Sequence, residues 1–408
     1  MDVVVDGTDE RAGRRALILL ALSLILGMAT WFSASAVIPQ LREDWGLTDP
    51  SAAWLTIAVQ LGFVAGALVS SVLNIPDIVH PARLMLVAAV GAAAMNLFLL
   101  PATGATTAIP FRFATGFFLA GMYPPALKLI ATWYRRARGL ALGVLVGALT
   151  LGSATPHLVN AVGGLEWKIV VVVTSVMTVV GGFIAVTVRE GPYPFSRAVF
   201  DPRQAGRAFA NRGVRLASLG YFGHMWELYA MWAWFVVFFR TSLDSGTDAD
   251  RGSAAAFAAF AVIGIGALGC WAGGILGDRW GRTRTTAAMM ATSGACAVLV
   301  GLVHEGPTPL LLAISLVWGF AVVGDSAQFS TMVTELGDQA YIGTAVTLQL
   351  AAGFTLTVAT IWLIPIFERS FGWQWAFAFL APGPALGVLA MLRLRSLPEA
   401  ARIAGGKG

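Results

Sequence analysis

The amino-acid sequence predicts an all-α integral membrane protein with twelve transmembrane helices in two pseudo-symmetric six-helix bundles. Three observations support this fold class. First, 57% of the 408 residues are hydrophobic and only 12% are charged, so polar side chains are too few to cover a soluble protein of this size. Second, the apolar residues form twelve long runs. Third, the basic residues concentrate in alternate connections between those runs.

Each predicted helix is an apolar run close to the roughly 20 residues that a helix needs to cross a bilayer. The first half has six such runs, near residues 15–38, 51–73, 82–100, 107–131, 138–160 and 167–188. The second half has six more, near residues 213–240, 253–276, 284–303, 308–333, 343–367 and 372–394. The segment 189–212 is rich in arginine, contains three prolines and has no run of spanning length. It is predicted to link an N-terminal bundle, 1–188, to a C-terminal bundle, 213–408.

The basic residues orient these helices. With both termini on the cytoplasmic side, 20 of the 27 lysines and arginines fall in cytoplasmic segments and five in outer loops, while Arg112 and Lys128 lie within the fourth helix. Cytoplasmic loops of membrane proteins carry such an excess of positive charge. The sequence therefore predicts a multi-pass protein of a bacterial cytoplasmic membrane with both termini in the cytoplasm. The first apolar run is too long for a signal-peptide core, so it is predicted to stay uncleaved.

The residue types argue against an enzyme, a metalloprotein and a nucleic-acid-binding protein. No P-loop or nucleophile elbow occurs, and the four histidines lack the spacing of metal ligands. Cys270 and Cys296 lie in apolar runs, which is typical of small core residues rather than of a disulfide or redox pair. The net charge of +5 is explained by the cytoplasmic loops. No cofactor, metal or nucleic acid is expected, and the protein is expected to be a monomer.

The most distinctive segment lies between the eighth and ninth apolar runs. It reads Gly274-Ile-Leu-Gly-Asp278-Arg279-Trp-Gly281-Arg282-Thr-Arg284, and we call it the charged segment. Charge beside hydrocarbon is costly, which places this segment at the membrane surface, in a loop between two helices. It matches the pattern G-x-x-x-D-R-x-G-R between paired helices of major facilitator superfamily transporters. The sequence thus resembles that superfamily, which implies gating roles for Gly274, Asp278, Arg279, Gly281 and Arg282.

The first half carries a degenerate copy of the charged segment. Superposing Asp77 on Asp278 places Arg83 on Arg284, but other residues replace the central arginine, glycine and arginine. Asp77 and Arg83 are included among the predicted gating residues. If the two copies form unequal sides of one gate, substitution of Asp278 is expected to impair transport more than substitution of Asp77.

Other stretches extend the resemblance along the chain. The spacing Arg112-x-x-x-Gly116-x-x-x-x-Gly121 resembles the second signature of the superfamily, in which the arginine is linked to proton coupling. The fifth helix lacks the Gly-Pro and Gly-Gly pairs of proton-driven drug exporters. Residues 131–143 and His224-Met-Trp-Glu227 resemble bacterial permeases grouped with nitrate/nitrite and cyanate porters, although the asparagine- and glycine-rich signatures of nitrate carriers are absent.

Four polar residues in the second half are candidates for the transport site. Glu227 lies near the middle of the seventh helix with His224 one turn earlier, and Asp325 lies in the tenth helix with Gln328 one turn later. An ionisable residue inside the bilayer is costly unless paired or hydrated, and it commonly marks function. Glu227 and Asp325 are predicted to couple protons, and His224 and Gln328 to bind substrate. The alternatives are a structural His224–Glu227 pair and an interhelical salt bridge of Asp325.

The first half supplies positive charge. Arg112 and Lys128 are predicted to attract an anionic substrate, but their separation places them about 160° apart on a regular helix. A kink at Pro124 and Pro125 would let both face one cavity. The fifth helix has a polar stripe that is predicted to face the interior, and two of its members, His157 and Asn160, are predicted substrate ligands. The fourteen tryptophans are predicted to lie mostly in the belts at the membrane interfaces.

These features predict a secondary active transporter that takes up a small anion or organic acid with protons by alternating access between its two halves. The expected partners are the small solute, protons and the lipid bilayer. The alternative is a proton-driven exporter of drugs or metabolites, which the acidic and aromatic seventh helix motivates.

Overall fold

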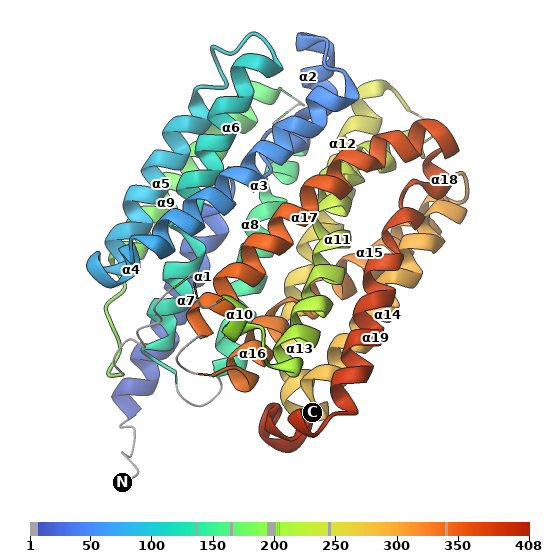
Figure 1. Cartoon of the computed structure of the whole chain (residues 1–408). Helices are drawn as coiled ribbons and strands as arrows, with labels where there is room; N and C mark the ends of the chain where they lie inside the picture. The colour runs from blue at the N-terminus through green and yellow to red at the C-terminus, as the bar shows by residue number, and fades with distance from the viewer. Residues whose placement is uncertain are drawn as a thin grey trace.

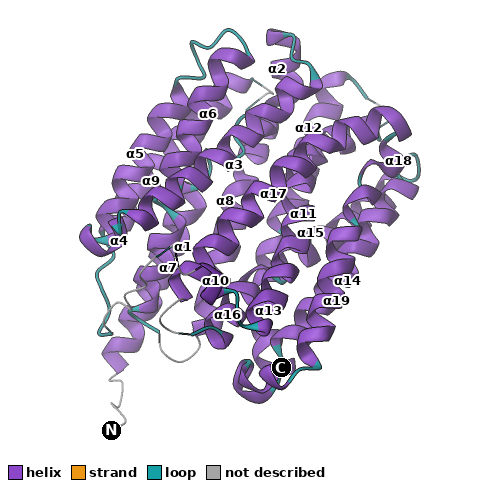
Figure 2. Ribbon diagram, in the orientation of Figure 1, coloured by secondary structure: helices purple, strands orange, loops and turns teal. Residues whose placement is uncertain are grey.

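The protein is described by a computed structural model that covers residues 7–134, 138–163, 166–193, 201, 203, 205–243, 246–338 and 342–408. Every regular element in these ranges is a helix, and Figure 2 shows the helices side by side in one bundle. The side chains of Asp77 and Arg138 and the whole of 194–200 lie outside the described residues.

The helices follow the predicted order. The first half contains α1 (Gly7–Gly27), η1 (Ser35–Val37), α2 (Ile38–Trp45), α3 (Asp49–Val72), α4 (Ile75–Ile78), α5 (Pro81–Leu97), α6 (Ala105–Leu119), α7 (Tyr123–Ala131), α8 (Arg138–Val162) and α9 (Trp167–Val186). After α10 (Ala205–Ala208), the second half contains α11 (Arg212–Thr241), α12 (Asp248–Gly264), α13 (Gly266–Trp280), α14 (Arg282–Leu302), α15 (Thr308–Gly324), α16 (Ser326–Leu336), α17 (Ile342–Phe371), α18 (Trp373–Ala376), η3 (Ala378–Leu380) and α19 (Pro382–Arg395). Two short 3-10 turns, η4 (Pro398–Arg402) and η5 (Ala404–Gly406), end the chain.

The predicted fold class is confirmed. Nine helical segments in the described ranges are long and apolar enough to span a membrane, and α5 is a shorter apolar helix. The helices α1 and α11, of 21 and 30 residues, complete the twelve predicted segments. Most residues of α11 are buried within the protein, including His224, Glu227, Trp232 and Trp234.

The two halves lie beside each other in Figure 1, the first in blue to green and the second in yellow-green to red. Within the first half α3 packs on α6, and α5 on α9, whereas in the second half α11 and α14 pack on α19. Contacts between the halves come chiefly from α8 with α12 and α13, and from α3 with α17. The start of α1 and the C-terminal turns lie at the same end of the bundle, which we call the terminal end.

Several predicted helices are broken, and a proline pair explains one of the breaks. The predicted fourth helix is interrupted between α6 and α7, and Pro124 and Pro125 lie at the start of α7. Proline lacks the backbone N–H and its ring clashes with the preceding turn, so the predicted kink is confirmed. The predicted first helix, 15–38, instead ends at Gly27, and residues 28–34 form a series of turns. The tenth breaks at Asp325, between α15 and α16.

Candidate functional site

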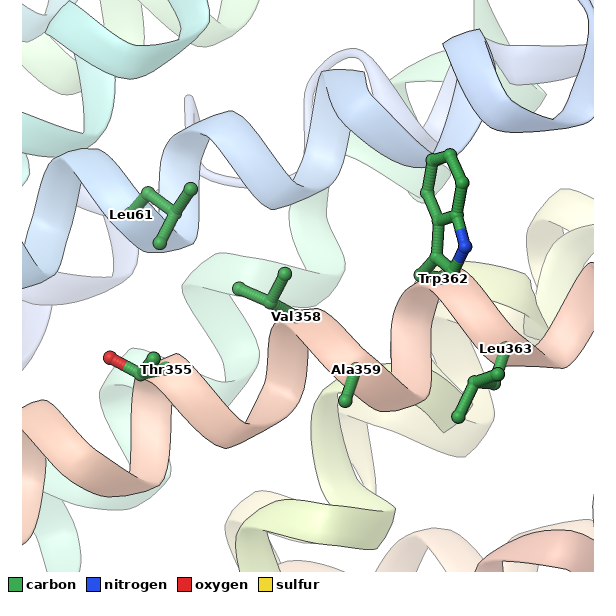
Figure 3. A pocket seen from close by; sticks show the side chains of 6 residues that line it. All are labelled: Leu61, Thr355, Val358, Ala359, Trp362 and Leu363. Carbon is green, nitrogen blue, oxygen red and sulfur yellow. The ribbon is translucent and has the colours of Figure 1, made fainter.

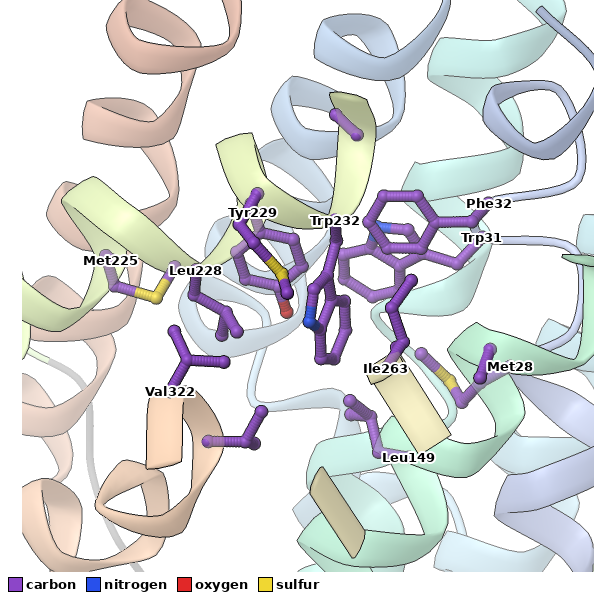
Figure 4. Close-up of a cluster of buried hydrophobic side chains, with 14 of the residues drawn as sticks. Met28, Trp31, Phe32, Leu149, Met225, Leu228, Tyr229, Trp232, Ile263 and Val322 are labelled. Carbon is purple, nitrogen blue, oxygen red and sulfur yellow. The ribbon is translucent and has the colours of Figure 1, made fainter. Parts of the chain in front are cut away.

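Aromatic rings from both halves meet in the middle of the molecule. Neighbouring ring centroids lie between 4.8 and 6.1 Å apart, and Figure 4 shows several of these rings facing one another. Every one of them is buried. We call this group the central aromatic cluster; it consists of Trp31, Phe32 and Phe63 of the first half and Tyr229, Trp232 and Phe354 of the second.

The prediction that tryptophans lie in interface belts is wrong for the most deeply buried ones. Trp31, Trp232, Trp234 and Trp318 are at most 2% exposed. Trp31 belongs to the turns at 28–34 and Trp232 to α11, and both rings contact other protein rings rather than lipid. Sequence reasoning placed them by residue type alone; the aromatic density of α11 was the signal that could have found the cluster.

Arg112 is fully buried and holds the turns at 28–34 in place. A chain that leaves the helical conformation frees backbone carbonyls, which must find donors elsewhere. The Arg112 guanidinium supplies them, with bonds to the carbonyl oxygens of Thr30 at 3.0 Å, Trp31 and Leu55 at 3.3 Å, and to side-chain oxygens of Ser33 and Asn96 at 3.1 Å each. Each of its three nitrogens thus bonds to an oxygen of the protein, and the geometry does not support the predicted direct bond from Arg112 to a substrate.

The structure does not bring Lys128 together with Arg112. Arg112 lies in α6, whereas Lys128 is half-buried in the last turn of α7, beyond the helix break. Asn160 also has a structural task, because its amide donates to the carbonyl of Ala36 at 2.8 Å and accepts from Gln40 at 3.1 Å. His157 is different: it is fully buried and neither ring nitrogen has a hydrogen-bond partner in the described part of the protein.

Glu227 is buried between three helices of the second half. Its carboxylate accepts a hydrogen bond from the Ser293 hydroxyl of α14 at 2.8 Å and one from the Trp318 indole of α15 at 2.7 Å. No cation pairs with it among the described residues. The carboxylate therefore points into the second half, away from the central aromatic cluster, although Leu228 and Tyr229 next to it in the chain reach that cluster.

His224 pairs with Asp325 rather than with Glu227. Its Nδ1 lies 2.8 Å from Asp325 Oδ1, and both side chains are at most 2% exposed. The alternative of a structural His224–Glu227 pair is therefore wrong, because the two side chains have different partners, whereas the alternative of an interhelical bridge for Asp325 matches the geometry. The break between α15 and α16 turns the Asp325 side chain toward α11.

The charged segment is a pair of helix ends rather than a loop. The helix α13 continues to Trp280, α14 begins at Arg282, and only Gly281 separates them, with φ of +95°. A side chain at Gly281 would be strained in this left-handed region and would meet the carbonyls of Lys407 and Gly408. The prediction of a loop is thus wrong, because one glycine suffices for the turn.

The charged segment closes the terminal end of the interface between the halves. A Cβ atom on Gly139 would lie 3.2 Å from the Asp278 carboxylate, so that carboxylate sits against the first turn of α8 in the other half, where a helix N-terminus favours negative charge. Farther along, Gly143 and Gly147 allow α8 to touch the backbone of α13. Gly274 faces the same stretch of α8. The gating role stays a prediction, and the packing is compatible with it.

Two arginines of the charged segment differ in burial: Arg282 is buried in a network of polar side chains, whereas Arg279 is exposed. Arg282 is 6% exposed; it binds both oxygens of Glu335 at 2.9–3.1 Å, Gln328 at 3.0 Å and Asp278 at 3.3 Å. Gln328 also donates to the Gly273 carbonyl at 3.1 Å. It therefore belongs to the Arg282 network, and this geometry does not support its predicted role as a substrate ligand. Arg83 is exposed at the start of α5.

We expect Arg282→Ala to lower the free energy of unfolding by about 2 kcal/mol, because it leaves the Glu335 carboxylate and the Gln328 amide without their shared partner. Arg279→Ala is the matched control, since it removes the same side chain from an exposed position of the same motif; its effect should stay within about 0.5 kcal/mol. Thermal unfolding of the purified variants in detergent measures the difference. Equal losses would show that the Arg282 network does not stabilise the fold.

A second set of contacts joins the halves at the opposite end. Asp49, at the start of α3, bonds to Arg42 of the first half and to Arg369 of α17 in the second half. Nearby, the rings of Trp54 and Trp362 lie 6.2 Å apart. The halves are therefore joined at both ends and through the central aromatic cluster, which encloses the middle of the molecule.

We expect Asp49→Asn to open the end opposite the termini more often. Arg369 is 60% exposed, so its bridge to Asp49 is weak, and losing it should raise the open population by about two- to five-fold. A cysteine at the buried Val236, placed in a chain without Cys270 and Cys296, reports opening through its labelling rate with a membrane-impermeant maleimide. Asp250→Asn, at an exposed helix start, is the control. An unchanged rate would mean that Asp49 does not hold this end closed.

A shallow apolar pocket of about 440 Å³ lies on the seam between α3 and α17. Figure 3 shows Leu61 on one helix and Thr355, Val358, Ala359, Trp362 and Leu363 on the other. Its lining has one hydroxyl group and no charge, so it lacks the groups to recognise a polar solute. The central aromatic cluster and the buried polar groups around it, which lie between the two halves, are the candidate site.

Comparisons with known proteins agree with this architecture. The sequence model of the Major Facilitator Superfamily matches residues 20–360. A search of curated proteins found no match. Among solved structures, the chain is similar to a bacterial homologue of the human lysosomal transporter Spinster in an inward-facing, unoccupied conformation, with 16% identity, a TM-score of 0.66 and coverage of 94% of this chain and 95% of that one. Such a likeness at low identity supports the fold alone.

With its twelve helical segments and the family match over most of its length, the chain belongs to the Major Facilitator Superfamily and is a multi-pass membrane transporter rather than an enzyme.

Proposed function

We propose that this transporter takes up a small organic acid or other small anion together with protons across a bacterial cytoplasmic membrane. It acts as a monomer with both termini in the cytoplasm, and its two bundles, 1–188 and 213–408, are joined by the linker 189–212. Solute binds where the bundles meet and is released when they rock from one access state to the other. Transporters built from such repeats commonly bind solute near the bilayer midplane.

The observation that carries the coupling proposal is the environment of Glu227. A carboxylate that is buried without a cation favours the protonated form unless hydrogen bonds or water compensate it. Here its two donors are the Ser293 hydroxyl and the Trp318 indole, and no cation pairs with it among the described residues. Movement of α11, which also carries Tyr229 and Trp232, would change that environment. Proton uptake and solute binding are thereby linked through one helix.

The buried His224–Asp325 pair is the second proposed coupling element. It lies one turn from Glu227 on α11 and at the break between α15 and α16. Opening the terminal end would move α16 relative to α11 and separate the pair. Separation would leave two buried ionisable side chains without their partner, which is costly inside a membrane.

The resemblance to nitrate/nitrite and cyanate porters supports the uptake of an anion in this proposal, but it does not identify nitrate, nitrite or cyanate as the solute. A small inorganic anion needs a desolvated cation or several donors, and the donors of Arg112 are already engaged by the turns at 28–34. An organic acid with an apolar part fits the central aromatic cluster better.

Uptake into proteoliposomes tests the function. An imposed inward-directed pH gradient should drive accumulation of a labelled organic acid, and a proton ionophore should abolish it. Liposomes that contain the Glu227→Gln protein are the comparison sample, and they should not accumulate the acid in response to the gradient. Accumulation that does not respond to the ionophore would exclude proton coupling.

The alternative is a proton-driven exporter of drugs or metabolites, and the aromatic character of the central cluster favours it. A drug-susceptibility panel on cells that overproduce the protein separates the two functions. An exporter raises resistance, whereas an uptake transporter leaves it unchanged or increases sensitivity to toxic analogues.

A further inference from the structure

We propose that the solute is a monocarboxylate with a flat apolar body, held within the central aromatic cluster. The inference deepens the proposed function and rests on it only for the location of the solute between the two halves. Three independent features of the described residues carry it: unpaired buried hydrogen-bonding groups, the stacked rings, and an uncompensated buried positive charge.

Unpaired polar groups surround the central aromatic cluster. The indole nitrogens of Trp31 and Trp232, both amide atoms of Gln60 and both ring nitrogens of His157 have no hydrogen-bond partner in the described part of the protein. Each of these side chains is at most 1% exposed. Buried polar groups in folded proteins are nearly always paired, so a group of unpaired ones requires a partner from outside the chain.

Helical spacing places Gln60 and His157 beside the cluster. On α3, Gln60 lies between Thr56, which bonds to Ser35, and Phe63, which belongs to the cluster. Residues three and four apart share a helix face, so Gln60 faces the turns at 28–34 as its neighbours do. His157 shares its face of α8 with Asn160, which bonds to Ala36 just after those turns.

These groups select a ligand that accepts hydrogen bonds. An indole N–H only donates, and the Gln60 amide and the His157 ring can donate as well as accept. A carboxylate has two oxygens that accept several bonds, whereas an ammonium group only donates and would leave the two indoles unpaired. The donor surplus therefore favours an acid over an amine.

The rings select the body of the ligand. Trp31 and Phe32 are each roughly stacked on Tyr229, at interplanar angles of 21° and 10°. These contacts join the two halves, so a ligand that enters between them must replace ring–ring contact with contact of its own. A flat apolar group does so, since aromatic pairs prefer stacked or edge-to-face packing. Nitrate, cyanate and acetate are too small to replace it.

Charge points the same way. The Arg112 guanidinium donates to the Trp31 carbonyl directly behind the cluster, and no carboxylate pairs with it in the part of the chain that the structure describes. Glu227 points away toward Ser293 and Trp318. The field of Arg112 in this low-dielectric site therefore favours an anion, even though its hydrogen bonds are already made.

Binding to the purified full-length protein in nanodiscs tests the proposal. The probes are benzoate, phenylacetate and indole-3-acetate, each with its amide and its matched amine, together with nitrate, cyanate and acetate. At least one flat carboxylate should bind about ten-fold or more tightly than its amide and amine, a difference of 1.4 kcal/mol, and the small anions should bind more weakly still. Trp232→Phe keeps an aromatic ring at this position but loses the N–H donor, so it should weaken carboxylate binding but not amine binding. Trp271→Phe, at an exposed position, is the control.

The results separate this proposal from the proposed function. Amides or amines that bind as tightly as the carboxylates, or small anions that bind more tightly, would overturn the inference, as would Trp232→Phe and Trp271→Phe with equal effects. Selective carboxylate binding without any response of transport to a pH gradient would uphold the ligand class and refute proton coupling. Proton-driven uptake of nitrate or cyanate without binding of any flat carboxylate would do the reverse.

Discussion

Glu227→Gln is expected to abolish proton-driven accumulation while leaving exchange of solute across the membrane intact. The amide keeps the size of the side chain and one acceptor for Ser293 or Trp318, but it cannot gain or lose a proton. With one proton per solute, a gradient of one pH unit supports accumulation of up to about ten-fold, equivalent to 1.4 kcal/mol. The variant should reduce that ratio to one. Uptake with and without a pH gradient, and counterflow of labelled solute, measure the two activities.

Glu305→Gln is the matched control, because it makes the same chemical change at an exposed position and should accumulate solute like the wild type. A Glu227→Gln protein that still accumulates solute in response to the gradient would move the coupling role to the His224–Asp325 pair. Loss of both accumulation and counterflow, with normal thermal unfolding, would instead indicate that Glu227 is needed for the access change itself.

The fold was predictable because a helix that crosses a membrane must be apolar over the thickness of the bilayer, and this requirement is visible in the sequence. Apolar runs near the bilayer length, separated by alternately basic connections, define the number and order of helices. Helix ends and breaks were harder. The proline pair after α6 was visible, whereas the turns at 28–34 contain no proline or other strong breaker. They depend on Arg112, which lies 79 or more residues away in sequence from the residues it bonds to in these turns.

The candidate site was predictable only in part, because residue type does not reveal the partner. Buried Glu227, His224, Asp325 and His157 were identified from charge and polarity inside apolar runs. The hydrogen-bond partners of these residues were not predicted, because they depend on which helices pack against each other. Gln328, one turn beyond Asp325, turned out to bind Arg282 of the charged segment. The central aromatic cluster was missed because an aromatic residue in an apolar run can face either the lipid or the protein interior, and the sequence does not distinguish the two positions.

Arg112→Met is expected to lower the free energy of unfolding by about 3 kcal/mol or more, since it removes the donors for carbonyls that have no helical partner at 28–34. Methionine retains most of the apolar stem, so the loss reports the guanidinium group rather than a cavity. The free energy of unfolding of Arg112→Lys should fall between those of the wild type and Arg112→Met. An ammonium group offers three donors but not the planar guanidinium fork that reaches both sides of the turn. Thermal unfolding of the purified proteins measures the series, with Arg393→Met, at an exposed position, as the control.

The same series tests whether Arg112 acts on the solute directly or through the turns that carry Trp31 and Phe32. If Arg112 positions those turns, Arg112→Lys should recover stability and solute affinity together, because both follow from the geometry of 28–34. If Arg112 bound solute directly, Arg112→Lys would restore the positive charge and much of the affinity without restoring stability. The observed bonds run to carbonyls of the turns and of α3, so stability and affinity are expected to change in parallel.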